Sequence, residues 1–72
     1  MAYNTKKIKQ FRRILNINQT ELATILGISL PSYSLKEQGK RLFNINEMTK
    51  ATEYFSEKLD KEMTVQDLFF TE

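Results

Sequence analysis

Residues 19–39 read QTELATILGISLPSYSLKEQG, and they carry the most specific structural signal in the chain. Apolar residues recur at helical spacing on both sides of Gly27, which permits the positive φ angle that a tight turn requires. Ala23 is small enough for two helices to cross closely, and Leu26 contributes to an apolar face. The pattern therefore predicts two short helices joined by a sharp turn, over about residues 18–39.

Polar residues at the start of each of these helices are typical of helix caps. Asn18 precedes the first helix and, with the acid three residues later, resembles a capping box in which Asn replaces the usual Ser or Thr. Ser29 is a good N-cap for the second helix, and Pro31 is tolerated in its first turn because no intrahelical hydrogen bond is lost there. That helix is expected to run to about Gln38 and to stop at Gly39.

A helix is also expected before this pair, over about residues 5–16. Three apolar residues at positions i, i+3 and i+7 form its core stripe, with Ile14 as a further candidate. The three residues are Ile8, Phe11 and Leu15.

Two more cap patterns follow the pair. Asn44 with Glu47 predicts a helix over about residues 45–59. Thr64 with Asp67 predicts a short last helix that contains Leu68, Phe69 and Phe70. The apolar side of the longer helix is expected to comprise Ile45, Met48, Ala51, Phe55 and Leu59.

Length and composition bound both the fold and the function. Seventy-two residues suffice for a single domain, and the predicted fold class is all-α: a compact bundle of four helices plus a short C-terminal fifth. The chain has no Cys and no His, so a disulfide or a Cys or His metal site cannot be built, and no cofactor is expected. An enzyme with a small-molecule substrate is the least favoured class, because those side chains supply most nucleophile–base pairs.

Charge divides the chain into two halves. Residues 1–41 carry eight Lys or Arg against two Glu, a net charge of +6, whereas residues 42–72 carry three Lys against seven acids, a net charge of −4. The basic half indicates an anionic partner on one side, and ordinary solvated helix faces explain the same charges equally well. No apolar run is long enough to span a bilayer and no secretory signal is visible, so a cytoplasmic protein is expected.

The central stretch resembles the repressor/Cro-type helix-turn-helix family. The matching residues are Gln19, Leu22, Ala23, Leu26, Gly27, Ile28, Ser29, Tyr33, Ser34, Glu37, Gly39, Lys40 and Arg41, and the resemblance covers about residues 6–70. With YSLKEQGKR and the terminal LFF, the chain is similar to small regulators of temperate phages from Gram-positive bacteria. The resemblance implies a phage-type lysis/lysogeny switch in a bacterial host, with the second helix of the pair in the DNA major groove.

The resemblance also assigns roles to individual residues. Gln19 matches a Gln that contacts phosphate and can buttress the second helix of the pair, which we call the reading helix. Ser29 matches a phosphate-facing position. Arg12 and Glu37 match a partly buried ion pair that links the first helix to the end of the third, and we predict that pair here. The positions that touch the DNA backbone in the family are occupied by Lys40 and Arg41.

The outward face of the reading helix departs from the family. Helical spacing places five residues on it, which are Leu30, Pro31, Ser34, Leu35 and Gln38. Sequence-specific DNA-binding proteins usually carry Gln, Asn, Arg or Lys at these positions, because base edges present hydrogen-bond donors and acceptors. Here the two Leu offer only a contact for a thymine methyl group, and Ser32 or Ser34 only a hydroxyl. Sequence-specific readout is therefore expected to be weak.

Three interpretations stay open. The first is a regulator that binds double-stranded operator DNA mainly through its phosphates. The second is an antirepressor that binds a partner repressor protein through an apolar patch of Leu30, Pro31, Tyr33 and Leu35. Its basic rim would comprise Arg12, Lys36, Lys40 and Arg41. The third is a homodimer surface; a dimer on DNA would need half-sites about one helical turn, roughly 34 Å, apart.

Overall fold

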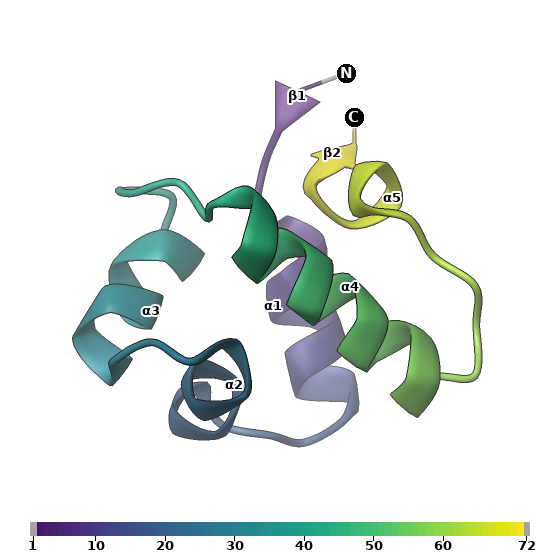
Figure 1. Cartoon of the computed structure of the whole chain (residues 1–72), viewed down its shortest axis with the longest axis horizontal. Helices are drawn as coiled ribbons and strands as arrows, with labels where there is room; N and C mark the ends of the chain where they lie inside the picture. The colour runs from purple at the N-terminus through teal and green to yellow at the C-terminus, as the bar shows by residue number, and fades with distance from the viewer. Residues whose placement is uncertain (1, 72) are drawn as a thin grey trace.

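The computed structural model describes residues 2–71 as five helices and a short β pair that joins the two ends of the chain (Figure 1). The helices are α1 (Lys6–Ile14), α2 (Gln19–Leu26), α3 (Leu30–Glu37), α4 (Ile45–Lys58) and α5 (Val65–Phe69). β1 (Ala2–Tyr3) pairs antiparallel with β2 (Phe70–Thr71), with Tyr3 opposite Phe70. The all-α fold class is confirmed, and the β pair is an addition, because two-residue strands are too short to leave an alternating pattern.

The predicted caps begin four of the helices. Asn18, Asn44 and Thr64 each form a capping box with the acid three residues later. The Ser29 hydroxyl oxygen accepts the Ser32 amide at 3.3 Å and begins α3. Each box satisfies amide groups that would otherwise lack a partner in the first turn, which is why local sequence alone marks these positions.

Residues in the left-handed backbone region follow four of the helices, and after α3 this residue is Gly39, with a φ of 83°. Gly27 follows α2 with a φ of 75°, Asn16 follows α1 with a φ of 57°, and Asp60 follows α4 with a φ of 50°. Asn and Asp tolerate this region better than other residues with a side chain. α1 therefore ends at Ile14, two residues before the predicted limit, because Asn16 has already left the helix.

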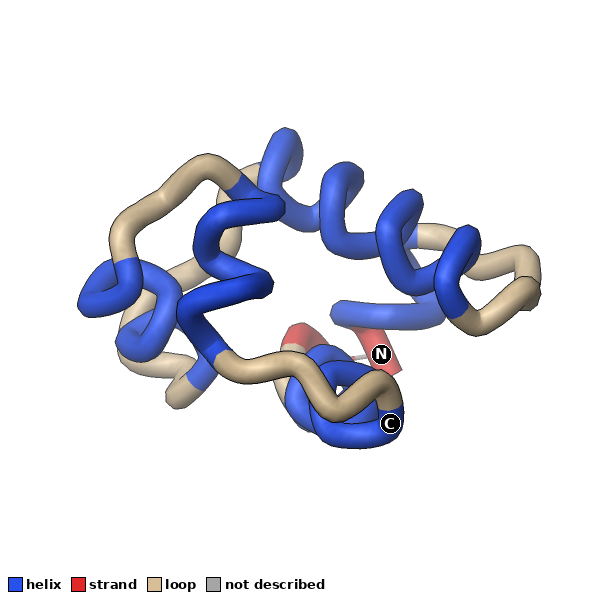
Figure 2. Tube along the Cα trace, turned by 90° about the horizontal axis from the view of Figure 1, so that it is seen from below, coloured by secondary structure: helices blue, strands red, loops and turns tan. Residues whose placement is uncertain are grey.

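One core joins all five helices. Its buried apolar residues are Ile8, Leu22, Ala23, Leu26, Tyr33, Phe43, Ala51, Phe55, Leu68 and Phe69. α4 crosses α1, with α2 and α3 on one side of this pair and α5 with the terminal strands on the other (Figures 1 and 2). The pair α2–α3 is therefore carried at one end of the bundle, where α3 has both a core side and an open side.

Two residues expected in the core are exposed instead. Ile45 exposes 63% of its surface and Ile14 exposes 58%. Ile14 is the last residue of α1 and Ile45 is the first residue of α4. Both follow the apolar spacing of their helix, but no neighbouring element covers these helix ends. Phe43, in the loop before α4, is only 2% exposed, although the helical pattern gave no reason to place it inside.

Candidate functional site

The turn between α2 and α3 fixes the angle at which α3 leaves the bundle. The Ile28 amide donates to the Ala23 carbonyl at 3.0 Å, and the Gly27 amide donates to the Thr24 carbonyl at 3.1 Å. These bonds close the end of α2 before α3 begins. The side chain of Tyr33 is fully buried, so it anchors the inner side of α3 and leaves the opposite side facing outward.

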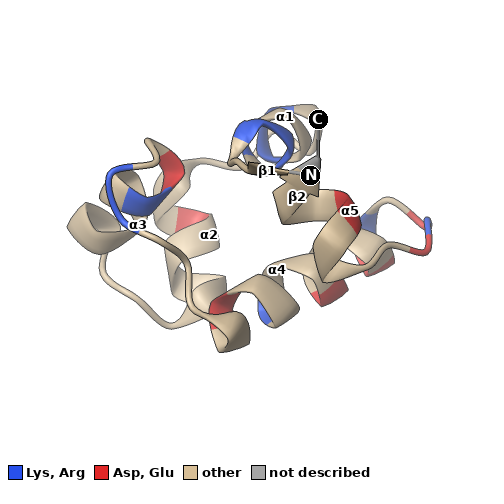
Figure 3. Ribbon diagram, turned by 90° about the horizontal axis from the view of Figure 1, so that it is seen from above, with Lys and Arg blue, Asp and Glu red and all other residues tan. Residues whose placement is uncertain are grey.

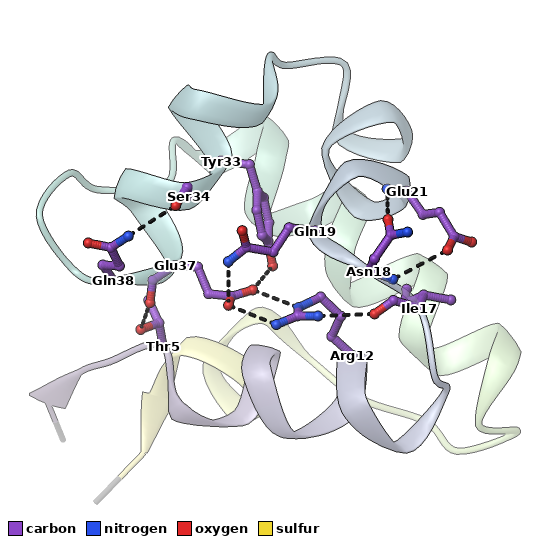
Figure 4. Close-up of polar contacts among 10 residues, drawn as sticks. All are labelled: Thr5, Arg12, Ile17, Asn18, Gln19, Glu21, Tyr33, Ser34, Glu37 and Gln38. Atoms are coloured by element: carbon purple, nitrogen blue, oxygen red, sulfur yellow. Dashed lines mark hydrogen bonds and ion pairs between the residues drawn. The ribbon is translucent and has the colours of Figure 1, made fainter.

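The carboxylate of Glu37, at the end of α3, binds side chains from three helices (Figure 4). Arg12 of α1 donates through Nε to Oε2 at 2.8 Å and through Nη2 to Oε1 at 3.0 Å. Gln19 of α2 donates to Oε1 at 3.0 Å, and the Tyr33 hydroxyl donates to Oε2 at 2.5 Å. The predicted Arg12–Glu37 ion pair is present, and with side chains only 13% and 4% exposed it is the buried form.

Hydrogen bonds around Glu37 also hold the neighbouring loops in place. Arg12 Nη1 donates to the Ile17 carbonyl at 3.0 Å, which holds the α1–α2 loop, and the Thr5 hydroxyl donates to the Glu37 carbonyl at 2.7 Å. No buried side-chain nitrogen or oxygen among residues 2–71 is left without a hydrogen-bond partner. The cluster therefore has a structural role and offers no free group to a ligand.

Ionisation in this cluster follows from burial and pairing. Burial alone raises the pKa of Glu37, but the hydrogen bonds from Arg12, Tyr33 and Gln19 outweigh it, so the pKa lies below its ordinary value. The bond to Glu37 raises the pKa of Arg12. Burial, and then the bond to Glu37, raise the pKa of Tyr33, which keeps its proton for donation.

Three residues predicted to touch a partner are bonded within the chain, and the first is Arg12, which the ion pair with Glu37 removes from the predicted basic rim. Gln19 donates to Glu37, so it takes the buttressing role, and the second hydrogen of its amide nitrogen is not used in this bond. Lys36 Nζ binds both oxygens of Glu47, at 2.7 and 2.8 Å, and its side chain is 12% exposed. Lys36 therefore joins α3 to α4 and does not belong to a basic rim.

Five of the remaining predicted residues form what we call the α3 face: Leu30, Pro31, Ser34, Leu35 and Gln38. Leu30 is 43% exposed, Pro31 and Gln38 are exposed, and the other two are half-buried. Gln38 donates to the Ser34 hydroxyl at 3.0 Å, so the amide and the hydroxyl partly satisfy each other. Tyr33 packs behind the helix pair in the core, so the apolar patch of the antirepressor interpretation does not include it.

The other predicted contacts flank this face. Ser29 is exposed before α3, and Ser32 in its first turn is half-buried. Lys40 and Arg41 are exposed in the loop after α3. Leu42, in the same loop, is 70% exposed and was missed by sequence reasoning, because a loop residue has no periodicity from which to infer exposure.

Opposite charges occupy different parts of the fold. Most cations lie on α1 and around the end of α3, whereas most acids lie along α4, α5 and the loop between them (Figure 3). The charge division seen along the sequence is thus also a division in space, and the open side of α3 lies in the basic part.

Comparison of the chain with protein-family models, curated proteins and solved structures finds no match. Within residues 2–71, no helix combines the length and apolar character needed to cross a bilayer. The same residues hold no group of three or more acidic side chains placed to bind a metal ion. The functional argument therefore depends on the geometry of α2 and α3 and on the charges around them.

Proposed function

We propose that this chain is a helix-turn-helix regulator of a phage-type genetic switch, acting in the cytoplasm of a bacterial host through its α3 face. One observation carries the proposal. The Glu37 cluster bonds α3 to α1 and α2 on its inner side and so holds the pair α2–α3 with its turn at Gly27. The outward side of α3 stays open. A rigid pair of this kind presents its second helix to a partner, and in DNA-binding proteins that helix enters the major groove.

Operator DNA is the first proposed partner. Ser29 lies at the positive end of α3, and Lys40 and Arg41 follow its other end, so phosphates can be contacted at both ends of the helix. Gln38 donates to the Ser34 hydroxyl, which engages one of its amide hydrogens, and the α3 face carries no Arg or Lys to bind a guanine. In this form, affinity comes mainly from phosphates and sequence preference is modest.

A partner repressor protein is the second candidate, which would make this chain an antirepressor. The specific observation that favours it is the chemistry of the α3 face. Leu30 and Pro31 are exposed beside half-buried Leu35, whereas Lys36 is withdrawn into its ion pair with Glu47. An apolar centre with cations at its edge is the usual anatomy of a protein interface.

A fluorescence anisotropy titration separates the two forms. The probe is a labelled duplex of the non-coding DNA beside this chain's own gene, at low and at physiological salt, with and without the neighbouring repressor. Tight binding that falls steeply with salt, in the absence of the repressor, supports the operator form. Release of the repressor from the probe by a chain that does not itself bind supports the antirepressor form. A chain that does neither would overturn the proposal.

Matched variants identify the surface in either case. In the operator form, Lys40→Ala weakens binding to all sequences and lowers the salt slope by about 1, whereas Leu30→Ala has little effect. In the antirepressor form, Leu30→Ala or Leu35→Ala weakens the complex by roughly fivefold or more. Leu42→Ala is the control, because Leu42 is an exposed leucine outside the α3 face.

A further inference from the structure

α1 carries a line of cations that the proposed α3 surface does not use. Lys6, Lys9 and Arg13 stand at positions i, i+3 and i+7, so they share one side of the helix. Lys6 and Arg13 are exposed and Lys9 is half-buried. Neither of the two ion pairs in the described part of the chain involves any of them, in contrast to Arg12.

This line continues into the loop after α3. A surface hollow of about 340 Å³ is lined by Lys6 and Lys9 from α1 and by Gly39 and Leu42 from the loop. Exposed Lys40 and Arg41 lie between those two loop residues in the sequence. We call the five cations the basic track; they are Lys6, Lys9, Arg13, Lys40 and Arg41.

The opposite side of α1 lies close to acidic residues. Lys7 lines a hollow together with Lys61, Glu62 and Asp67, so acids surround it. Arg13 shares a hollow with Glu21, whose carboxylate also accepts the Asn18 amide in the α2 cap, and the two side chains do not form an ion pair. The positive charge of the basic track is therefore left for a partner outside the chain.

We propose that the α1 part of the basic track, Lys6, Lys9 and Arg13, binds the phosphate backbone of duplex DNA and extends the phosphate contact already proposed for Lys40 and Arg41 beyond the α3 face. This part presents three cations on one side of the helix, and the large exposed apolar side chain that borders them, Leu42, lies in the loop after α3, so charge dominates this surface. From Lys6 to Arg13 it extends about 10 Å at 1.5 Å per residue, which matches about three nucleotides of one strand at 3.4 Å each. The inference rests on the DNA-binding form of the proposed function.

Two triple variants of equal charge test the basic track. The first replaces Lys6, Lys9 and Arg13 by Gln, and the second replaces Lys7, Lys58 and Lys61, which lie on the acidic part of the molecule. Gln has a helix propensity close to that of Lys and Arg, so both variants are expected to fold. Far-UV circular dichroism and a thermal melt of each variant establish that they do.

The readout is the slope of log K against log salt concentration for a labelled duplex. Each lost phosphate contact lowers the slope by about 0.9, so the first triple variant is expected to lose up to about 2.7 while the second keeps the slope of the unchanged chain. Equal losses in both variants, or no loss in the first, would overturn the inference. So would failure of the unchanged chain to bind duplex at low salt. A first triple variant that binds DNA normally but no longer binds the neighbouring repressor would reassign the track to an acidic protein.

A third variant, Leu30→Glu, separates this inference from the proposed function. Leu30 is exposed on the α3 face and lies outside the basic track. Loss of DNA binding in Leu30→Glu, with the first triple variant unaffected, would leave the α3 proposal standing and overturn the basic track. Loss in the triple variant alone would support the track and remove DNA contact from the α3 face.

Discussion

Glu37 places a negative charge inside a protein of 72 residues, and its surroundings explain how the fold tolerates it. Its carboxylate accepts two bonds from Arg12, one from Gln19 and one from Tyr33. A buried charge is costly unless it is paired and hydrogen-bonded, and here both conditions hold. The identity of these side chains therefore matters more to stability than that of the exposed charges nearby.

Arg12→Ala is expected to destabilise the fold by about 3–5 kcal/mol, because Glu37 would remain buried without its ion-pair partner. Arg13→Ala is the matched control, since Arg13 is exposed and adjacent on the same helix, and it should change stability by less than about 0.5 kcal/mol. Because a core of this size usually supplies no more than about 3–5 kcal/mol, Arg12→Ala should be largely unfolded by circular dichroism at 25 °C, whereas Arg13→Ala should show a urea transition like that of the unchanged chain. Equal midpoints for the two variants would contradict the structural role assigned to the ion pair.

The lowered pKa of Glu37 predicts an acid-sensitive contribution to stability. Because its folded-state pKa lies below the unfolded value of about 4.3, the contribution is present above that pH and is lost as the pH falls through the folded-state value. Glu37→Gln should therefore be less stable than the unchanged chain near pH 6, with a difference that shrinks below about pH 4. Melts from pH 6 to pH 2.5 test this, with exposed Glu53→Gln as the charge-matched control.

At the scale of elements, α3 is held on three sides. The Glu37 cluster joins its last turn to α1 and α2, Lys36 joins it to Glu47 of α4, and Tyr33 packs in the core. The turn at Gly27 determines where α3 starts, because its φ of 75° is the left-handed conformation. Rigid placement of α3 is what allows its outward face to act as one surface.

Gly27→Ala is expected to lower stability by about 1–2 kcal/mol through backbone strain alone. A Cβ at this position would meet its nearest atom, Lys50 Nζ, at 3.9 Å, which is ordinary contact, so crowding adds nothing. Gly27→Asn should recover part of the loss, because Asn adopts the left-handed region more readily. The melting temperature of the Ala variant should fall by about 4–8 °C for each kcal/mol of stability lost. An Asn variant that melts at a lower temperature than the Ala variant would contradict this explanation.

At the scale of the whole molecule, aromatic side chains connect both chain ends to α3. The ring of Tyr3 stacks on Phe69 with centroids 6.3 Å apart, Phe69 lies 5.4 Å from Phe43, and Phe43 lies 5.8 Å from Tyr33. The Tyr3 hydroxyl also accepts the Phe43 amide at 3.2 Å. The two ends are thus part of the same core as the helix pair, and the chain is expected to unfold as one unit.

Phe69→Ala tests this unity. Removing a fully buried Phe costs about 3–5 kcal/mol, which equals what a core of this size usually supplies, so the variant should be largely unfolded at 25 °C. Phe70→Ala, at a half-buried neighbour, should remain folded with a lower melting temperature. Loss of near-ultraviolet dichroism in Phe69→Ala with retained signal in Phe70→Ala is the expected pattern. A Phe69→Ala variant that keeps α1–α3 intact would show that the end of the chain is dispensable.

Much of the fold could be read from short-range signals. The caps at Asn18, Ser29, Asn44 and Thr64 lie where they were predicted, because a cap bonds to an amide only three residues away. The Arg12–Glu37 pair came from a family resemblance and not from spacing. The exposure of Ile45 and the burial of Phe43 were not foreseen, because they depend on which element lies opposite.

Local sequence is enough to define the helices, their order and the turn at Gly27, because these depend on backbone conformation and neighbouring side chains. Which polar groups remain free for a partner depends on how the helices pack against each other. Lys36 lies 11 residues from Glu47, and Gln19 lies 18 residues from Glu37, and each pair meets only when the helices pack. Periodicity places a charge on a side of its own helix, but whether that charge is satisfied depends on the charges that the other helices bring to it.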